Sequence, residues 1–205
     1  MSVEPIATVA GVPLAVGVLD DAEARLRTSR FAAGLPVSGT SEGRQLRRWL
    51  TQLIVTERML AAEVAARGLS GRGAPSEAEL LPDVTARLEI GSVAAAALAD
   101  PRARALFAEV TAAVRVADSD VAAYHVRNPL RFAAPQQGEN GWRTTASAAP
   151  PLHEVRSAIE GHLRGAAQRR AFRLWLDARR AALVELAPGY EHPGDPRQPD
   201  NTHRH

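Results

Sequence analysis

The 205-residue sequence contains no cysteine, which excludes disulfide bonds and thiolate metal sites. Lysine is also missing: all 25 basic residues are arginine, and 23 acidic residues nearly cancel them, leaving a net charge of +2. Aromatic residues make up 4% of the chain while alanine is abundant, a balance that favours many helices packed through small side chains. No run of 18 apolar residues occurs, so neither a membrane-spanning helix nor a membrane partner is expected.

The first residues, MSVEPIATVAGVPLAVGVLDD, lack the basic start and the small-residue cleavage site of a secretory signal. The sequence therefore predicts a cytoplasmic protein. Two clusters of arginine are interpreted as solvated helix faces, and without helix-turn-helix or zinc-finger spacing no nucleic-acid partner is expected. The clusters are Arg44, Arg47 and Arg48, and Arg164, Arg169, Arg170, Arg173, Arg179 and Arg180.

The clearest helical pattern lies between residues 46 and 64. Apolar side chains recur there every three or four residues, which is typical of a helix that buries one face. Ser41 is expected to cap the start of this helix, and Gly68 is expected to end it. The apolar positions are Leu46, Leu50, Leu53, Leu60 and Val64.

A second long helix, of about 30 residues, is predicted to open at Pro151, because proline is favoured in the first helical turn. Val184 and Leu186 then predict a last short strand. One path along this helix is traced by Val155, Ile159, Leu163, Ala166, Arg170, Leu174 and Arg179.

Shorter elements fill the N-terminal part. Valine-rich residues 6–18 surround Ala10-Gly11, which favours a small hairpin. Asp20 and Asp21 are expected to cap a helix that runs to about Arg30.

The middle of the chain adds further helices. Asp100-Pro101 predicts a helix start, because a capping acid precedes a proline. A short apolar strand at Val114 is then expected to lead into a helix capped by Asp118, which stops at Asn128-Pro129. The predicted fold class is mainly α with two or three short strands. Residues 1–187 are expected to form a single helical domain, and residues 188–205 form a polar tail rich in proline and histidine.

Four segments in this order resemble the SurA- and PrsA-type parvulin chaperones. The resemblance covers roughly residues 6–186, and it rests on segments that are each degenerate but occur in the right order. The segments are IATVAGVPLAV, RRWLTQLIVTERMLAAEVAARGL, RVADSDVAAYHVRNPLRF and PPLHEVRSAIEGHLRGAAQRRAFRLWLDARRAALVEL.

This resemblance implies a SurA N-terminal-like helical chaperone module that is completed by a long C-terminal helix. Such a module would hold a client protein or peptide, or would assist a specific biosynthetic enzyme. In that family a catalytic parvulin domain lies between the third and fourth segments, but here only the 18 residues 133–150 separate them. We therefore expect no prolyl isomerase activity and no cofactor, and the sequence leaves a homodimer open.

Client binding by such a module would use an apolar groove between helices. Aromatic side chains are the candidates to line it, although an aromatic residue at helical spacing is more often part of the core, above all Trp49 and Trp175. The candidate client-binding residues are Trp49, Phe107, Tyr124, Phe132, Trp142 and Trp175.

One alternative is a small acyl-transfer enzyme. Residues 39–43, GTSEG, match the G-x-S-x-G pattern that places a nucleophilic serine at a sharp turn between a strand and a helix. Pro36 argues against a preceding central strand, and no alternation of strands and helices supplies the required sheet. Capping of the following helix is the favoured interpretation of Ser41.

The other alternative is a divalent metal ion bound by the tail. His203 and His205 lie two residues apart, and His192 lies within reach along the same segment, which together suit Zn²⁺, Ni²⁺ or Fe²⁺. Against this, the polar tail offers no rigid framework.

Overall fold

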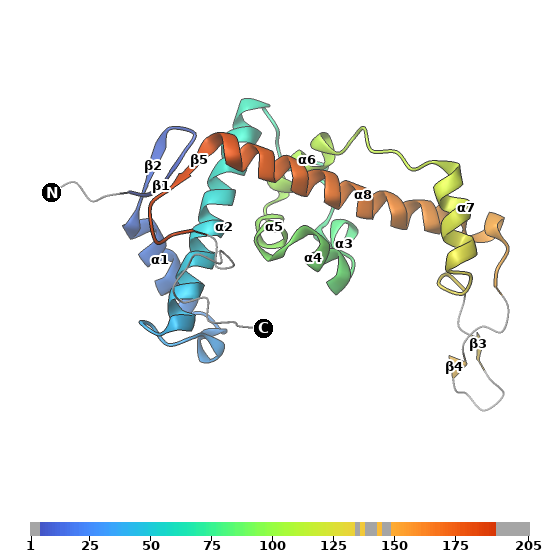
Figure 1. Cartoon of the computed structure of the whole chain (residues 1–205), viewed down its shortest axis with the longest axis horizontal. Helices are drawn as coiled ribbons and strands as arrows, with labels where there is room; N and C mark the ends of the chain where they lie inside the picture. The colour runs from blue at the N-terminus through green and yellow to red at the C-terminus, as the bar shows by residue number, and fades with distance from the viewer. Residues whose placement is uncertain (1–4, 134–135, 138–142, 145–148, 192–205) are drawn as a thin grey trace.

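The computed structural model describes residues 5–133, 136–137, 143–144 and 149–191. This part of the chain forms eight α-helices and a small three-stranded antiparallel sheet (Figure 1). None of these helices is long and apolar enough to span a membrane. The helices are α1 (Val16–Arg27), α2 (Ser41–Ala66), α3 (Glu77–Leu80), α4 (Val84–Ile90), α5 (Ser92–Ala97), α6 (Pro101–Val110), α7 (Asp118–Arg127) and α8 (Leu152–Leu183).

The sheet joins the two ends of the described chain. Strand β1 (Pro5–Val9) pairs with β2 (Val12–Ala15) across the predicted turn, in which Ala10 and Gly11 both have positive φ angles of 50° and 78°. Alanine is disfavoured in this conformation, and here its N–H donates to the Leu183 carbonyl at 2.8 Å. Strand β5 (Val184–Leu186) pairs with the other edge of β1, giving the order β2-β1-β5. The predicted hairpin and the predicted last strand are therefore confirmed.

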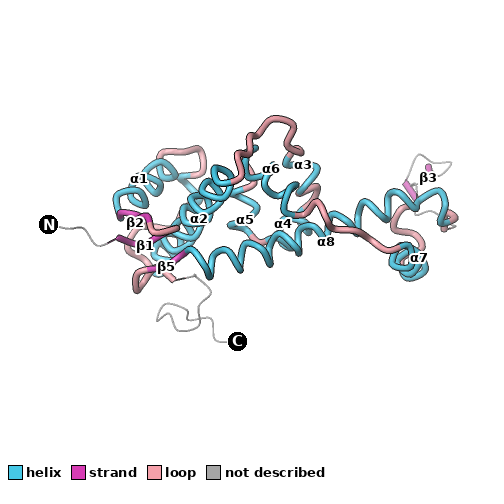
Figure 2. The backbone as a smooth tube through the Cα atoms, turned by 90° about the horizontal axis from the view of Figure 1, so that it is seen from above, coloured by secondary structure: helices cyan, strands magenta, loops and turns pink. Residues whose placement is uncertain are grey.

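Helix α8 connects the sheet to the far end of the molecule. It is 32 residues long and contacts α2, α4, α6 and α7 in turn. Figure 1 shows α2 crossing beneath one end of α8, with α3 to α5 under its middle. Both views place α7 at the opposite end of α8 from the sheet (Figure 2). The prediction of a long C-terminal helix that returns to the N-terminal part is confirmed.

Two separate apolar cores lie along this arrangement. The large one is formed by the sheet, α1, α2, α4 to α6 and the C-terminal half of α8, with Leu19, Leu98 and Leu106 fully enclosed. The small one lies where α7 crosses the N-terminal half of α8, and its buried residues are Val121, Val155 and Ile159. Between α7 and α8, the paired two-residue strands β3 (Gln136–Gln137) and β4 (Arg143–Thr144) lie in the 18-residue link.

Helix α2 has well-defined ends. Its N-cap is Thr40, whose hydroxyl accepts a hydrogen bond from the Gly43 N–H at 3.1 Å, so the cap predicted at Ser41 is wrong by one residue. Ser41 already has helical geometry because Gly39, with a φ of 83°, turns the chain one residue earlier than expected. At the other end Gly68 follows the C-cap, and the Leu69 N–H donates to the Val64 carbonyl, as in a Schellman motif.

Two other predicted helix starts are also corrected. Helix α1 begins at Val16, before Asp20, because β2 runs directly into it without a side-chain cap. Helix α7 begins at Asp118, but the N-cap is Ala117 and no side chain caps it; the Asp118 carboxylate pairs with Arg156 on α8 instead. Residues 114–117 form a loop rather than the predicted strand, and Val116 packs against the small core. The predicted cap at Asp100 is confirmed.

Candidate functional site

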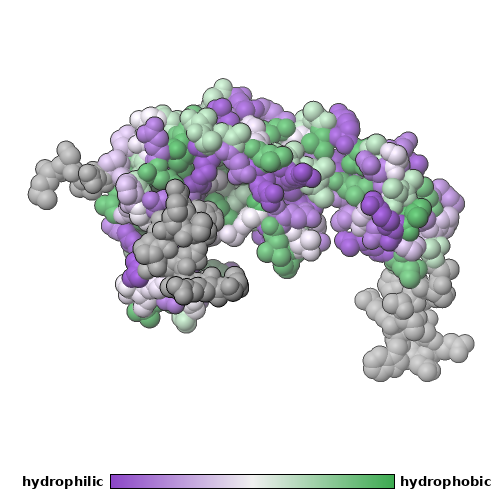
Figure 3. All heavy atoms as spheres, viewed as in Figure 1, coloured by the Kyte–Doolittle hydropathy of each residue, from purple (hydrophilic) through white to green (hydrophobic). Residues whose placement is uncertain are grey.

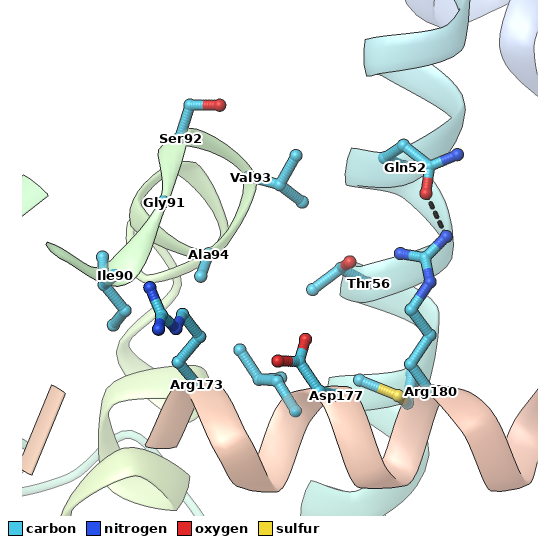
Figure 4. A pocket seen from close by; sticks show the side chains of 12 residues that line it. Gln52, Thr56, Ile90, Gly91, Ser92, Val93, Ala94, Arg173, Asp177 and Arg180 are labelled. Atoms are coloured by element: carbon cyan, nitrogen blue, oxygen red, sulfur yellow. Dashed lines mark hydrogen bonds between the residues drawn. The ribbon is translucent and has the colours of Figure 1, made fainter. Parts of the chain in front are cut away.

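A pocket of about 330 Å³ opens where α8 passes over α2 and the junction of α4 and α5. Figure 4 shows side chains from all three places pointing toward the shared space. The pocket is the candidate functional site of the described part of the chain. Its lining residues are Gln52, Thr56, Met59, Ile90, Gly91, Ser92, Val93, Ala94, Arg173, Leu176, Asp177 and Arg180.

The walls follow from local sequence. On α2, Gln52, Thr56 and Met59 are spaced so that all three face the same side of the helix. The opposite wall exists because the chain breaks between α4 and α5 at Gly91, whose φ of 89° and ψ of 150° are accessible almost only to glycine. This break lets Ile90 and Val93 approach the pocket from two short helices rather than from one straight one.

Arg180 and Gln52 form the polar wall. The Arg180 guanidinium donates a hydrogen bond to the Gln52 side-chain oxygen, and the Gln52 amide donates to the Tyr190 carbonyl at 2.9 Å. Gln52 is fully buried by these contacts. Burial lowers the pKa of Arg180, and the negative charge of Asp177 opposes this effect only in part. The Arg180 cation is thus partly removed from water while its hydrogen-bond partner is a neutral amide.

The other inward-facing arginines of α8 are paired with carboxylates. Arg169 donates to Glu89 on α4 at 2.7 Å, and Arg179 donates to Glu63 on α2 at 2.8 Å. Within the described residues no carboxylate forms an ion pair with Arg180. Arg180 therefore differs from its neighbours in having a desolvated charge without a directly bonded counter-ion.

The rim of the pocket carries two more charges from α8. Arg173 is exposed, and its guanidinium donates to the Glu89 backbone carbonyl at 3.2 Å. Asp177 lies between Arg173 and Arg180 in Figure 4 and forms no hydrogen bond or ion pair with the described residues. Apolar side chains of Met59, Ile90 and Leu176 complete the floor. A floor of this kind with a charged rim can bind a ligand, and no histidine is among the described residues that line it.

The predicted aromatic residues that the structure describes do not line this pocket. Trp49 contacts the pocket wall without lining the pocket. Its indole N–H donates a hydrogen bond to the hydroxyl of Ser92 on α5 at 3.1 Å. Phe107 is 1% exposed in the large core, with its ring centre 4.9 Å from that of Phe172. Trp175 stacks on the other side of Phe172 at 5.5 Å.

Two further candidates belong to the small core. The ring centres of Tyr124 and Phe132 are 6.2 Å apart, and both rings contact His162. Trp142 lies outside the described residues. The structure therefore divides the five described aromatic candidates among separate places instead of gathering them in one groove.

The structure tests the alternative serine site at Ser41 but not the alternative metal site in the tail. Residues 35–38 before Ser41 form no strand, and Ser41 lies in the first turn of α2, so the strand-to-helix elbow of a nucleophilic serine is not formed. The metal-ligand candidates His192, His203 and His205 lie outside the described residues. Among the residues that are described, no group of three histidine or acidic side chains could hold a metal ion.

The sequence did not predict the pocket because the α8 arginines were interpreted as a solvated helix face. That interpretation is wrong for Arg169, which is 6% exposed, and incomplete for Arg179 and Arg180, which are partly buried. One signal was available: buried Phe172 and Leu176 continue through Arg180 at helical spacing.

The comparisons with known proteins match only the N-terminal part of the chain. A family model described as a family of unknown function (DUF7158) matches residues 5–42, which include the hairpin, α1 and the turn before α2. None of these residues lines the pocket. No curated protein and no solved structure matches the chain.

Proposed function

We propose that this chain is a non-catalytic, chaperone-like protein that binds a segment of a client polypeptide in the pocket between α2, α5 and α8. The proposal includes the resemblance to the N- and C-terminal chaperone module of SurA- and PrsA-type proteins. The client is an unfolded or partly folded protein, or an enzyme whose assembly this protein assists.

The way the chain closes on itself supports this proposal. Strand β5 and the end of α8 complete the N-terminal sheet, so the first and last segments form one body, as the resemblance implies. The link between residues 133 and 150 is only 18 residues long, which is too short for a catalytic domain. What such a module would retain is a surface for binding.

The open pocket is the observation that carries the proposal. Its volume of about 330 Å³ lies at the lower end of the range for ligand-binding pockets, so it suits one or two side chains of an extended segment. In Figure 3 apolar residues form separate patches among polar ones on the visible face. A client would therefore be held through the pocket rather than across a broad apolar surface.

Blocking the pocket tests the proposal. Val93 lines the pocket and is partly exposed, so Val93→Trp is expected to fill it. Val84 is 72% exposed on neighbouring α4 and does not line the pocket, so Val84→Trp is the matched control. We expect wild type and the control to suppress aggregation of a chemically unfolded test protein, and Val93→Trp to need about tenfold more protein for the same effect, which corresponds to the loss of roughly 1.4 kcal/mol of binding.

Three results bear on the outcome. Far-UV circular dichroism of both variants checks that the fold is kept. Equal activity of the two tryptophan variants would show that clients bind elsewhere. If wild-type protein neither suppresses aggregation nor binds labelled peptides, the chaperone proposal is wrong.

A further inference from the structure

Arg180 lines the pocket, and its contacts within the fold do not neutralise its charge. The inward arginines Arg169 and Arg179 each donate a hydrogen bond to a carboxylate, whereas Arg180, among the described residues, donates to the neutral side chain of Gln52 and has Asp177 nearby without a hydrogen bond to it. A guanidinium has five N–H donors in a planar fork, so one bond to Gln52 leaves most of them available. These remaining donors belong to a side chain that lines an open pocket.

Electrostatics favours an anion at this place. Burial disfavours the charged form of Arg180, and an anion brought into contact would stabilise that form again. Carboxylates match the guanidinium fork in shape and can accept two parallel hydrogen bonds from it. Arg173 on the rim supplies a second cation on the same side of α8.

We propose that the pocket recognises a carboxylate of the bound polypeptide through Arg180, with Arg173 assisting at the rim. This inference rests on the proposed function and names the chemical class of the bound group. Asp177 lies between the two arginines, so the three charges sum to +1, which suits a singly charged carboxylate better than a doubly charged phosphate. The apolar floor beside it suits a neighbouring aliphatic side chain of the same segment.

Such a carboxylate has two sources in a polypeptide: an acidic side chain or the chain end. Four N-acetylated and otherwise uncharged hexapeptides with the centre Leu-X-Leu, with X as Glu or Gln and with the C-terminus free or amidated, separate them in isothermal titration calorimetry. We expect the peptide without any carboxylate to bind about tenfold more weakly than the better of the two singly charged peptides. The stronger of those two identifies the source. Equal affinity of all four peptides would overturn the inference and leave the proposed function intact.

Variants of α8 then assign the preference to residues. Arg180→Gln is expected to abolish the difference between charged and neutral peptides, and Arg173→Gln to reduce it. Arg170→Gln is the matched control, because Arg170 is exposed on the same helix, does not line the pocket and carries the same charge. Arg173 is exposed, so its variant keeps the test usable if Arg180→Gln disturbs the Gln52 contacts. An unchanged preference in both pocket variants would overturn the inference.

A small-molecule measurement separates this inference from the proposed function. Butyrate is expected to raise the melting temperature of the wild type more than its neutral analogue butyramide does, and Arg180→Gln should remove this difference. If no peptide binds but butyrate still stabilises through Arg180, the polypeptide proposal is wrong while the carboxylate site stands. If butyrate and butyramide act alike and the peptides show no preference, the carboxylate site is wrong.

Discussion

At the scale of single residues, the chain buries several charges and gives them defined partners. Glu63 on α2 is the best example, since it is enclosed in the large core region and holds Arg67 on its own helix and Arg179 on α8. Burial alone would raise the pKa of Glu63, but hydrogen bonds from Arg179 and Arg67 outweigh burial and lower the pKa below its ordinary value. The ionised form of Glu63 is therefore the form that stabilises the fold.

Replacing this carboxylate has an expected cost and an expected pH dependence. Because the substitution leaves the partly buried Arg179 without its carboxylate and leaves Arg67 paired with Glu109 alone, Glu63→Gln should lower the free energy of unfolding at pH 7 by about 2 kcal/mol. A lowered pKa gives stability that is present above the unfolded-state pKa, near 4.5, and that is lost as the pH falls through the folded-state value. The difference between wild type and variant should therefore shrink below about pH 4.5, as measured by urea unfolding over a pH series.

Glu109 provides the matched control for this prediction. Its side chain is 42% exposed and pairs with the same Arg67, so Glu109→Gln should cost less than about 1 kcal/mol. A difference between Glu63→Gln and wild type that stays constant from pH 7 to pH 3 would contradict the assignment.

At the scale of elements, α8 shows how far the sequence could predict the fold. The length of α8 and its start near Pro151 followed from periodicity and proline placement, whereas its return to the N-terminal part was implied by the resemblance to parvulin-type chaperones. Periodicity did not predict which residues of α8 face inward, because Leu174 is 57% exposed while Arg169 is buried. A periodicity argument counts arginine as polar and therefore places it on the solvent-facing side of a helix. The ion pair with Glu89 on α4 makes the inward position of Arg169 favourable. Such pairing between distant segments cannot be predicted from the sequence of one helix.

The pocket could not be predicted from the sequence for a similar reason. The pocket depends on the Gly91 break and on the contact of Arg180 with Gln52 on α2, and this contact joins residues 128 positions apart in the sequence. The aromatic candidates were chosen because large apolar side chains dominate binding sites, but this structure uses Phe107 and Phe172 to fill the large core instead.

Two glycines on α8 give a prediction at this scale. Gly161 has open space where a methyl group would lie, so Gly161→Ala should raise the free energy of unfolding by about 0.5–1 kcal/mol through helix propensity. At Gly165 the added carbon would lie 3.1 Å from the Arg169 guanidinium, which Glu89 and the Leu80 carbonyl hold in place. Gly165→Ala should therefore give no gain, or a loss, in thermal unfolding. Equal stabilisation by both alanines would mean that Arg169 moves freely.

At the scale of the whole molecule, α8 carries two cores of unequal size. The small core at α7 has three buried apolar residues, and the large core has many more. Since the stability of a region scales with the apolar surface it buries, the α7 end should open locally before the rest unfolds. The pocket lies over the large core, so such opening would leave it formed.

Hydrogen exchange with one variant in each core tests this division. Ile159 is fully buried in the small core, and Ile159→Ala should cost the α7 end about 2–5 kcal/mol, enough to remove amide protection from residues 118–127 and 152–163. Protection in α2 should stay at the wild-type level. Leu106 is equally buried in the large core, and Leu106→Ala should weaken protection in α2 and in both halves of α8, because the small core depends on a helix anchored there. If Ile159→Ala accelerates exchange in α2 as much as in α7, the two cores unfold as one unit, and motion at α7 would then reach the pocket.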